Sequence, residues 1–251
     1  MMKRRGNHGQ ILAVSALVIA LIMISTAIYI YDLSGSIGDG GVYLLNDYVQ
    51  SITLGSKHTI ISALANITNG GSNETLAANL DAWSMTVEKQ YVFGTFTLNH
   101  TLRGTPPYIS GLYVNWDTLG NGVSEASADF TLNASGRELK MQYPFQVNVS
   151  TVLQAQGYLT EVSPLSKQIT IVFNLFNEEQ PALARNVTIR YGYLGAWLVP
   201  NAAENYSLTD YGNGTYKATF ALVTAATSLD VAVQVFDSRG ILVCANATLT
   251  Q

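Results

Sequence analysis

The residues best suited to chemistry are asparagines in Asn-x-Ser/Thr triplets, the acceptor pattern for N-linked sugar. Nine of the 18 asparagines in the 251-residue chain lie in such triplets. Chance would give roughly three, since serine and threonine make up about a sixth of the chain. The alternative is that these residues simply dominate the turns and strand faces of a β-rich protein. We predict a glycosylated surface with acceptors at Asn66, Asn73, Asn99, Asn133, Asn148, Asn186, Asn205, Asn213 and Asn246.

Catalytic patterns are sparse. His8, His58 and His100 are far apart and show no metal-ligand spacing, and the acidic residues are scattered. The chain contains no His-Glu-x-x-His, Cys-x-x-Cys, Gly-x-Ser-x-Gly or phosphate-binding glycine loop. We therefore expect no enzyme activity, no metal and no cofactor. His100 falls on the apolar face of a predicted strand, which favours a half-buried histidine over a ligand.

Cys244 is the single cysteine, so a disulfide within the chain is excluded. It alternates with Val243 and Ala245, which places it on the strand face of Asn246, and we expect it to point outward. A small residue without a special role is the simplest interpretation, with a disulfide between chains as the alternative.

The N-terminal segment decides where these residues are located. Lys3, Arg4 and Arg5 precede a run of 21 uncharged residues, 11–31. A bilayer core of about 30 Å needs about 20 apolar residues, so residues 1–31 read as a cytoplasmic tail and a transmembrane helix. The following flank contains acids and no Lys or Arg, which predicts that the C-terminal bulk is extracellular. The run is longer than the roughly 7–15 apolar residues of a cleaved signal peptide, although Ser34-Gly35-Ser36 offers a cut site.

The charge balance restricts the partners. Charged residues make up 12% of the chain. Without Lys3, Arg4 and Arg5, ten Lys and Arg remain against 17 Asp and Glu, a formal charge of −7. A nucleic-acid groove or a basic membrane patch is therefore not expected. The expected partners are the lipid bilayer and copies of itself or other surface proteins.

Residues 32–92 read as a glycine joint followed by helices, because apolar residues then recur three and four apart. A break near Gly55 is predicted to split the first helical stretch, which runs from Leu45 to Ile67. A further helix should begin at Ser72 or Asn73, either of which can cap it. Its apolar stripe would pack on the following sheet or, alternatively, on another subunit; the stripe consists of Leu76, Leu80, Trp83, Val87 and Tyr91.

From residue 93 the apolar period changes to two, which is typical of half-buried antiparallel strands. Residues 93–156 are predicted to form one antiparallel β-region, in which Pro144 places the strand over 139–149 at a sheet edge or in a bulge. Residues 154–164 are predicted as the boundary to a second β-unit over 157–251. Its strands are expected at 169–176, 187–193, 216–222, 229–235 and 241–249, with a two-residue turn at Asn213-Gly214 and a longer one at residues 237–240. This spacing predicts a β-sandwich.

The turn Gly-Asn-Gly-Thr-Tyr at 212–216 and the hairpin Phe-Asp-Ser-Arg-Gly at 236–240 resemble those of immunoglobulin-like modules of prokaryotic surface proteins, although the paired cysteines of antibody domains are missing. Arg4-Arg5-Gly6, with Gly9 ahead of the apolar run, is similar to the class III signal of archaeal pilins and archaellins. That resemblance implies cleavage after Gly6 and a mature terminus at Asn7. The chain departs from it at Asp32 and the glycines over 35–41, which interrupt the long apolar helix of a filament core.

As a whole the chain resembles single-pass archaeal surface proteins with an immunoglobulin-like module. The fold expected is mainly β, with an N-terminal transmembrane helix, a short helical segment and a C-terminal antiparallel sandwich. The predicted function is that of a membrane-anchored, N-glycosylated extracellular protein for adhesion or cell-envelope structure. The alternatives are a pilin-like or archaellin-like filament subunit and a secreted enzyme or solute-binding component.

Overall fold

The computed structural model describes residues 46–90, 95–117, 119–135 and 140–251. The predictions for the tail, the apolar run, the glycine joint and cleavage between Gly6 and Asn7 lie outside these ranges. Within them, no helix has both the length and the apolar character needed to cross a bilayer. The chain divides into two compact units, Met1–Ile52 and Thr53–Gln251, and the described residues of the first unit, 46–52, are all helical.

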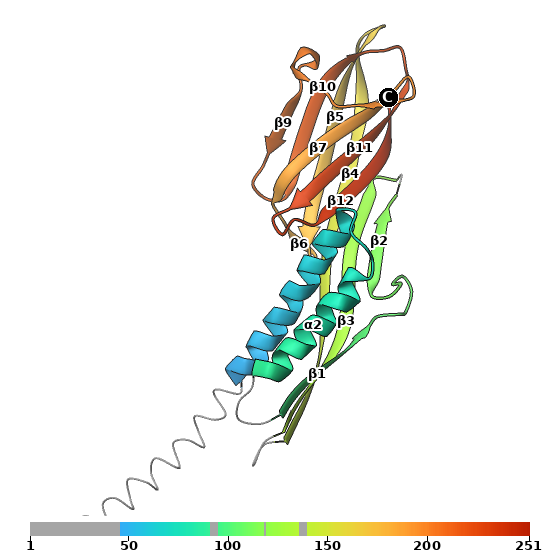
Figure 1. Ribbon diagram of the computed structural model, residues 1–251. Coiled ribbons are helices and arrows are strands. Elements are labelled where there is room, and N and C mark those ends of the chain that lie inside the picture. The colour runs from blue at the N-terminus through green and yellow to red at the C-terminus, as the bar shows by residue number, and fades with distance from the viewer. Residues whose placement is uncertain (1–45, 91–94, 118, 136–139) are drawn as a thin grey trace, which may run out of the picture. The chain divides into compact units, whose positions relative to one another are not determined.

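The second unit is mainly β with antiparallel sheets, as predicted (Figure 1). Its helical parts are the continuation of the first helix to residue 68, α2 (Thr75–Gln90) and the short 3₁₀ turn η1 (Ala202–Glu204). The strands are β1 (Thr95–Leu102), β2 (Leu112–Trp116), β3 (Asn121–Ser135), β4 (Lys140–Ser163), β5 (Ser166–Asn177), β6 (Gln180–Pro181), β7 (Ala184–Tyr193), β8 (Ala196–Leu198), β9 (Ser207–Asp210), β10 (Thr215–Val223), β11 (Ser228–Asp237) and β12 (Leu242–Thr250).

The larger sheet has the order β1-β3-β4-β5-β10-β9, with β2 also paired to β3 and β6 to β5. Its 24-residue strand β4 belongs to two regions, because residues 140–154 pair with β3 and residues 151–163 pair with β5. One strand therefore runs through the interval predicted as a boundary. Leu153, Ala155 and Leu159 keep the period-two burial there. Gly157 permits close packing, since a Cβ would lie 2.3 Å from the Thr170 carbonyl oxygen.

Pro144 lies in the part of β4 that pairs with β3 before β5 joins at Thr151. It sits opposite Thr131 in an unbroken register. Of the two alternatives predicted for this strand, the structure shows the edge position, and the pairing of β3 with β4 contains no bulge. The missing N–H of a proline is tolerated at an edge because no ladder bond depends on it.

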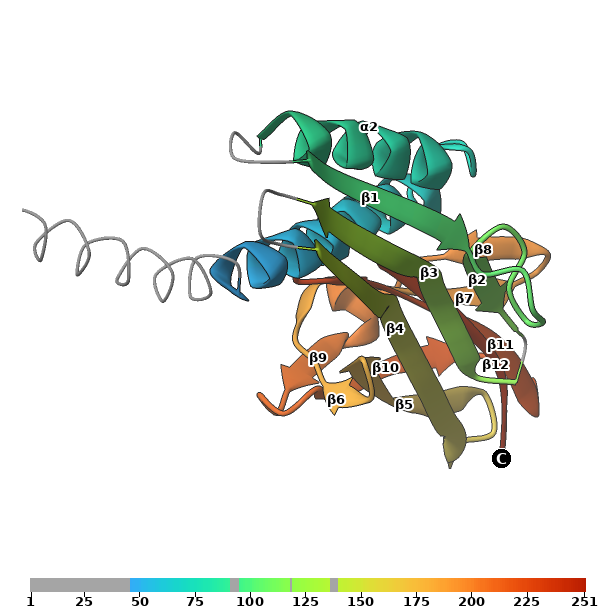
Figure 2. The same ribbon diagram turned by 90° about the horizontal axis from the view of Figure 1, so that it is seen from below.

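The two helices of this unit pack on the β-region, with α2 along β1 (Figure 2). Leu76 and Leu80 of α2 are fully buried, and the Ser72 hydroxyl accepts a hydrogen bond from the Glu74 amide at 3.2 Å, as expected for a cap. The predicted break at Gly55 is wrong, because residues 46–68 are continuously helical. Gly55 instead makes room for Trp83, whose ring carbon Cζ2 would lie 2.2 Å from a Cβ at this position.

The smaller sheet has the order β12-β11-β7-β8 and shares one hydrophobic core with β4, β5 and β10. All five strands predicted beyond residue 164 are present, whereas the short strands β2, β6, β8 and β9 were not predicted. The hairpin between β9 and β10 has a four-residue loop, longer than predicted. Its positive φ angles fall on Gly212 (74°) and Gly214 (82°), while Asn213 lies between them.

Candidate functional site

The most highly organised polar group in the described structure surrounds Asp237, at the end of β11. Its side chain is fully buried. Oδ1 accepts hydrogen bonds from the backbone N–H groups of Arg239 and Ile241, both at 2.9 Å, which closes the β11–β12 turn. Gly240 completes the turn with a φ of 84°. A buried carboxylate is stable only when it is paired, and its pairing involves several segments of the chain.

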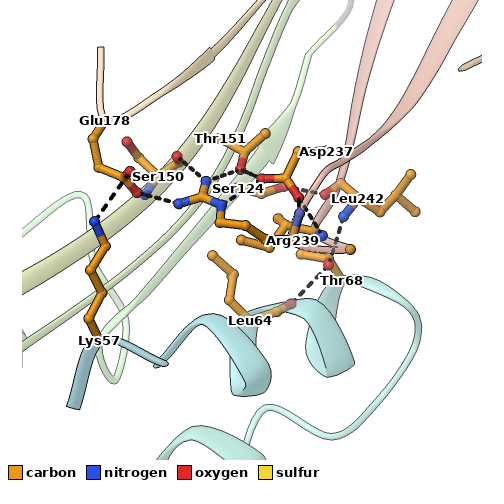
Figure 3. A network of polar contacts seen from close by, with 12 residues as sticks. Lys57, Leu64, Thr68, Ser124, Ser150, Thr151, Glu178, Asp237, Arg239 and Leu242 are labelled. Carbon is orange, nitrogen blue, oxygen red and sulfur yellow. Dashed lines mark hydrogen bonds and ion pairs between the residues drawn. The ribbon is translucent and has the colours of Figure 1, made fainter. Parts of the chain in front are cut away.

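Arg239 supplies the opposite charge and connects three segments (Figure 3). Its Nε donates to Asp237 Oδ2 at 2.8 Å, and Nη1 donates to Glu178 Oε1 at 2.6 Å. Nη2 donates to the carbonyl oxygen of Ser150 and to the hydroxyl of Thr151, both at 2.9 Å. The Thr151 hydroxyl in turn donates to Asp237 Oδ2 at 3.1 Å. One guanidinium thus joins the β11–β12 turn, the middle of β4 and the β5–β6 turn.

Glu178 extends this network to the helix that ends at residue 68. Its Oε1 also accepts from the Ser150 backbone N–H at 3.2 Å, and its Oε2 lies 3.6 Å from Lys57 Nζ. Glu178 has a φ of 45°, which is unusual for a residue with a side chain and fits the tight turn that presents it. Two cations and two carboxylates are therefore matched in this junction.

The end of the same helix binds the β11–β12 hairpin directly. The backbone N–H of Leu242 donates to the Thr68 hydroxyl at 3.1 Å, and that hydroxyl donates to the Leu64 carbonyl oxygen at 2.8 Å. The side-chain amide of Asn69 donates to the Gly240 carbonyl oxygen at 3.1 Å. We call the residues Lys57, Thr68, Asn69, Ser150, Thr151, Glu178, Asp237 and Arg239 the polar junction.

The free edge of β12 is covered by the turn between β2 and β3. The Gly120 N–H donates to the Asn246 carbonyl oxygen at 2.7 Å, and the Asn246 N–H donates to the Asp117 carbonyl oxygen at 3.1 Å. Close by, the Ser124 hydroxyl donates to the Leu242 carbonyl oxygen at 2.7 Å. Covering an edge in this way satisfies backbone groups that would otherwise template pairing with another chain.

The polar junction is suited to fixing geometry and not to catalysis. Its carboxylates are held by Arg239, Lys57 and backbone donors, and the one hydroxyl at its centre, that of Thr151, both donates and accepts. The sequence identified Asp237 and Arg239 only as turn residues and did not single out Glu178. A signal was present, because Asp237 continues the alternation of Val233 and Val235 and so falls on the buried face of β11.

The nine predicted acceptor asparagines are spread over the described surface. Seven are exposed, and Asn133 and Asn246 are half-buried. The Asn148 side-chain amide donates to Glu125 Oε1 at 2.6 Å. Glycosylation at these sites remains a prediction.

The two described histidines lie apart. His58 lies on the helix beside Gly55 and Trp83. His100 is half-buried, as expected from its strand face, with Nε2 3.7 Å from Asp81 Oδ1 and Nδ1 3.4 Å from the Ser84 hydroxyl. In the described part of the chain, no three His, Cys, Asp or Glu residues are placed to hold a metal ion.

Cys244 lies on the outer face of its sheet, the face shared with Asn246, as predicted, but only 5% of the residue is exposed. Gln234 sits directly opposite on β11 and hydrogen-bonds to the thiol, and Arg190 is nearby. Burial raises the pKa of the Cys244 thiol from 9.0 to about 11, and the Gln234 hydrogen bond and Arg190 offset this only in part.

We expect iodoacetamide at pH 8 to label Cys244 in the folded protein about 100-fold more slowly than in the protein unfolded in guanidinium chloride, because the thiolate reacts and its population is low. Mass spectrometry of timed samples measures the labelling. Equal rates in the two states would show that the thiol is accessible.

The raised pKa of the thiol also means that its contribution to stability is present below pH 9 and is lost as the pH rises towards 11.

Comparison of the chain with models of protein families, with curated proteins and with solved structures found no match. The proposal for its function therefore depends on its own sequence and on the geometry described above.

Proposed function

We propose that the chain is a membrane-anchored, N-glycosylated extracellular protein with a structural or adhesive role in the cell envelope. The observation that carries the proposal is the position of the acceptor asparagines. All nine follow the predicted anchor, and none has a buried side chain, although five of them lie within strands. On those strands they occupy the face opposite the core, where an attached sugar meets solvent.

The order of strands supports an immunoglobulin-like C-terminal module. The second half of β4 followed by β5, β10 and β9 corresponds to the A-B-E-D sheet of such modules, and β12-β11-β7-β8 corresponds to G-F-C-C′. Modules of this architecture are widespread in cell-surface proteins. The fold alone does not define an activity, so this likeness adds weight to the location and not to any chemistry.

The polar junction favours a structural role within the second unit. It ties the helix through Lys57 and Thr68, β4 through Thr151 and the module through Arg239. A paired network of this kind, buried at Asp237, restricts the relative movement of the segments that it joins. A surface protein that presents a module in one orientation benefits from such a restriction.

A filament subunit is the second candidate, favoured by two observations. The basic residues, Gly6 and Gly9 ahead of the apolar run are similar to a class III signal. The described chain also begins with helical residues 46–68 before the β-region, and archaellin-like subunits join an N-terminal helix to a glycosylated β-domain.

The mature N-terminus and the glycopeptides of protein recovered from membranes distinguish these candidates. We expect mass spectrometry to find Met1 or Met2 at the terminus and sugar on several acceptor peptides. The Asn186→Gln variant should lose only the sugar at that exposed site, which checks that the glycopeptide has been assigned to the correct asparagine. A start at Asn7 would replace the anchored protein with the filament subunit, and a start near Ile37 would show release from the membrane. Acceptor peptides without any sugar would overturn the proposal that the chain is an extracellular glycoprotein.

A further inference from the structure

The outer face of the β12-β11-β7-β8 sheet contains a hollow of about 540 Å³ beside an exposed tryptophan. Trp197 of β8 is 53% exposed. Directly across from it on β7 is Gly192, which has no side chain, and beyond Gly192 lies Asp230 of β11. The indole ring therefore has no side chain directly across from it on β7.

The next set of paired residues on the same face also places a small residue between longer side chains. Ala232 of β11 pairs with Arg190 on one side and Asn246 on the other. Ala232 is buried at the bottom of the hollow, while Arg190 is exposed and Asn246 is half-buried. Gly192 and Ala232 thus form a low floor between longer polar side chains.

Polar side chains surround the floor, and one of them is held in place by a hydrogen bond. The Thr248 hydroxyl donates to Asp230 Oδ1 at 2.7 Å, which fixes the carboxylate. Asn246 offers an amide that can donate and accept, Gln234 offers the part of its amide that is not bonded to Cys244, and Arg190 offers several donors in a plane. The single positive charge of Arg190 and the single negative charge of Asp230 give the lining no net charge.

We propose that this hollow binds a neutral saccharide. A sugar ring has an apolar C–H face, which packs on the electron-rich face of an indole, and hydroxyl groups that both donate and accept hydrogen bonds. The hollow combines one exposed indole with planar polar side chains around a floor of small residues, within the usual volume of small-molecule sites. A strongly anionic ligand would meet Asp230, and a purely apolar one would leave the amides unpaired.

The saccharide has two sources, because Asn246 itself is a predicted acceptor in the lining. The sugar is either the chain's own glycan at Asn246 or a glycan of another molecule. In the second case a neutral saccharide is the class of ligand that the proposed adhesive protein binds, and this part of the inference rests on the proposed function. Saccharide binding by purified protein is measured without reference to the membrane, so its failure is distinct from failure of the N-terminal and glycopeptide test.

The test uses the full chain in detergent, produced in a host without N-glycosylation, on an array of neutral hexose and N-acetylhexosamine oligosaccharides. We expect retention on the array that falls about ten-fold or more in Trp197→Ala, since an aromatic side chain that becomes covered on binding carries much of such a contact. Leu198→Ala is the matched control, because Leu198 is the next residue of β8 and points to the opposite face.

The natively glycosylated protein separates the two sources. If the glycan at Asn246 fills the hollow, acrylamide quenching of Trp197 fluorescence, obtained as the difference between wild type and Trp197→Phe, should increase in Asn246→Gln. Array binding by both glycosylated and unglycosylated protein would instead indicate a glycan of another molecule. The proposal is overturned if the unglycosylated chain shows no Trp197-dependent binding and Asn246→Gln leaves the quenching unchanged.

Discussion

Asp237→Asn is expected to lower the free energy of unfolding by about 3 kcal/mol, because it removes one partner of a buried, hydrogen-bonded ion pair. The carboxylate of Asp237 is fully buried and accepts four hydrogen bonds. The oxygen of an asparagine can still accept from the backbone N–H groups of Arg239 and Ile241, but the NH₂ group in the place of Oδ2 cannot accept from the guanidinium. Arg239 would then keep Glu178 as a carboxylate partner and lose the charge of Asp237. Urea denaturation of the full chain in detergent, followed by tryptophan fluorescence, measures the change.

Asp210→Asn is the matched control for this substitution. Asp210 also ends a strand at a hairpin and accepts a backbone N–H, that of Gly212 at 2.7 Å, but it is exposed. The same chemical change there should cost less than about 0.5 kcal/mol. The double variant Asp237→Asn with Arg239→Gln should be more stable than the sum of the single losses predicts, since both charges are then removed. Equal small losses at Asp237 and Asp210 would show that the polar junction contributes nothing.

The strands that could be predicted are those whose own residues carry the pattern. In β4 the alternation of Met141, Tyr143, Phe145, Val147 and Val149 indicates a half-buried strand without knowledge of its partners. The same holds for β5, β10, β11 and β12, which the sequence located to within three residues. The short strands β2, β8 and β9 have no such signal, because three to five residues are too few to show a period. They exist because longer neighbours pair with them.

Glycine was the least reliable guide, because its role depends on residues far away in the chain. Gly55 reads as a helix breaker, yet it lies inside a helix to accommodate Trp83. Gly157 reads as part of a boundary, yet it lies inside β4 to accommodate the backbone of β5. A single sequence shows the absence of a side chain and not the group that fills the space.

The polar junction could not be assembled from the sequence for a related reason. Lys57, Ser150, Glu178 and Arg239 are separated by tens of residues, and each alone resembles an ordinary surface side chain. Only the position of Asp237 on an apolar face was anomalous. Likewise the alternation around Cys244 identified its sheet face correctly, but the thiol is buried beside Gln234 of β11, with Arg190 of β7 nearby. Burial of an outward-facing residue depends on those neighbours.

Gly122→Ala is expected to lower the free energy of unfolding by about 3 kcal/mol, as much as Asp237→Asn, because the new methyl group overpacks the space between two backbones. A Cβ at Gly122 would lie 2.0 Å from the carbonyl oxygen of Cys244 in β12. Gly122 cannot move away easily, because it pairs with Leu153 of β4 on one side and with Trp116 of β2 on the other. The strain must therefore displace β12 from β3, at the point where the two sheets meet. Urea denaturation measures the loss of stability.

Gly104→Ala is the matched control, since a Cβ there meets no atom within 4 Å and the φ angle is not positive. It should change the free energy of unfolding by less than about 0.5 kcal/mol, or raise it slightly by restricting the unfolded chain. Iodoacetamide gives an independent readout, because displacement of β12 should also make Cys244 react faster in Gly122→Ala under native conditions. If Gly122→Ala matches Gly104→Ala in both stability and labelling, the close contact between β3 and β12 does not exist. If stability falls while labelling is unchanged, the strain is relieved elsewhere in β3, and β12 keeps its place.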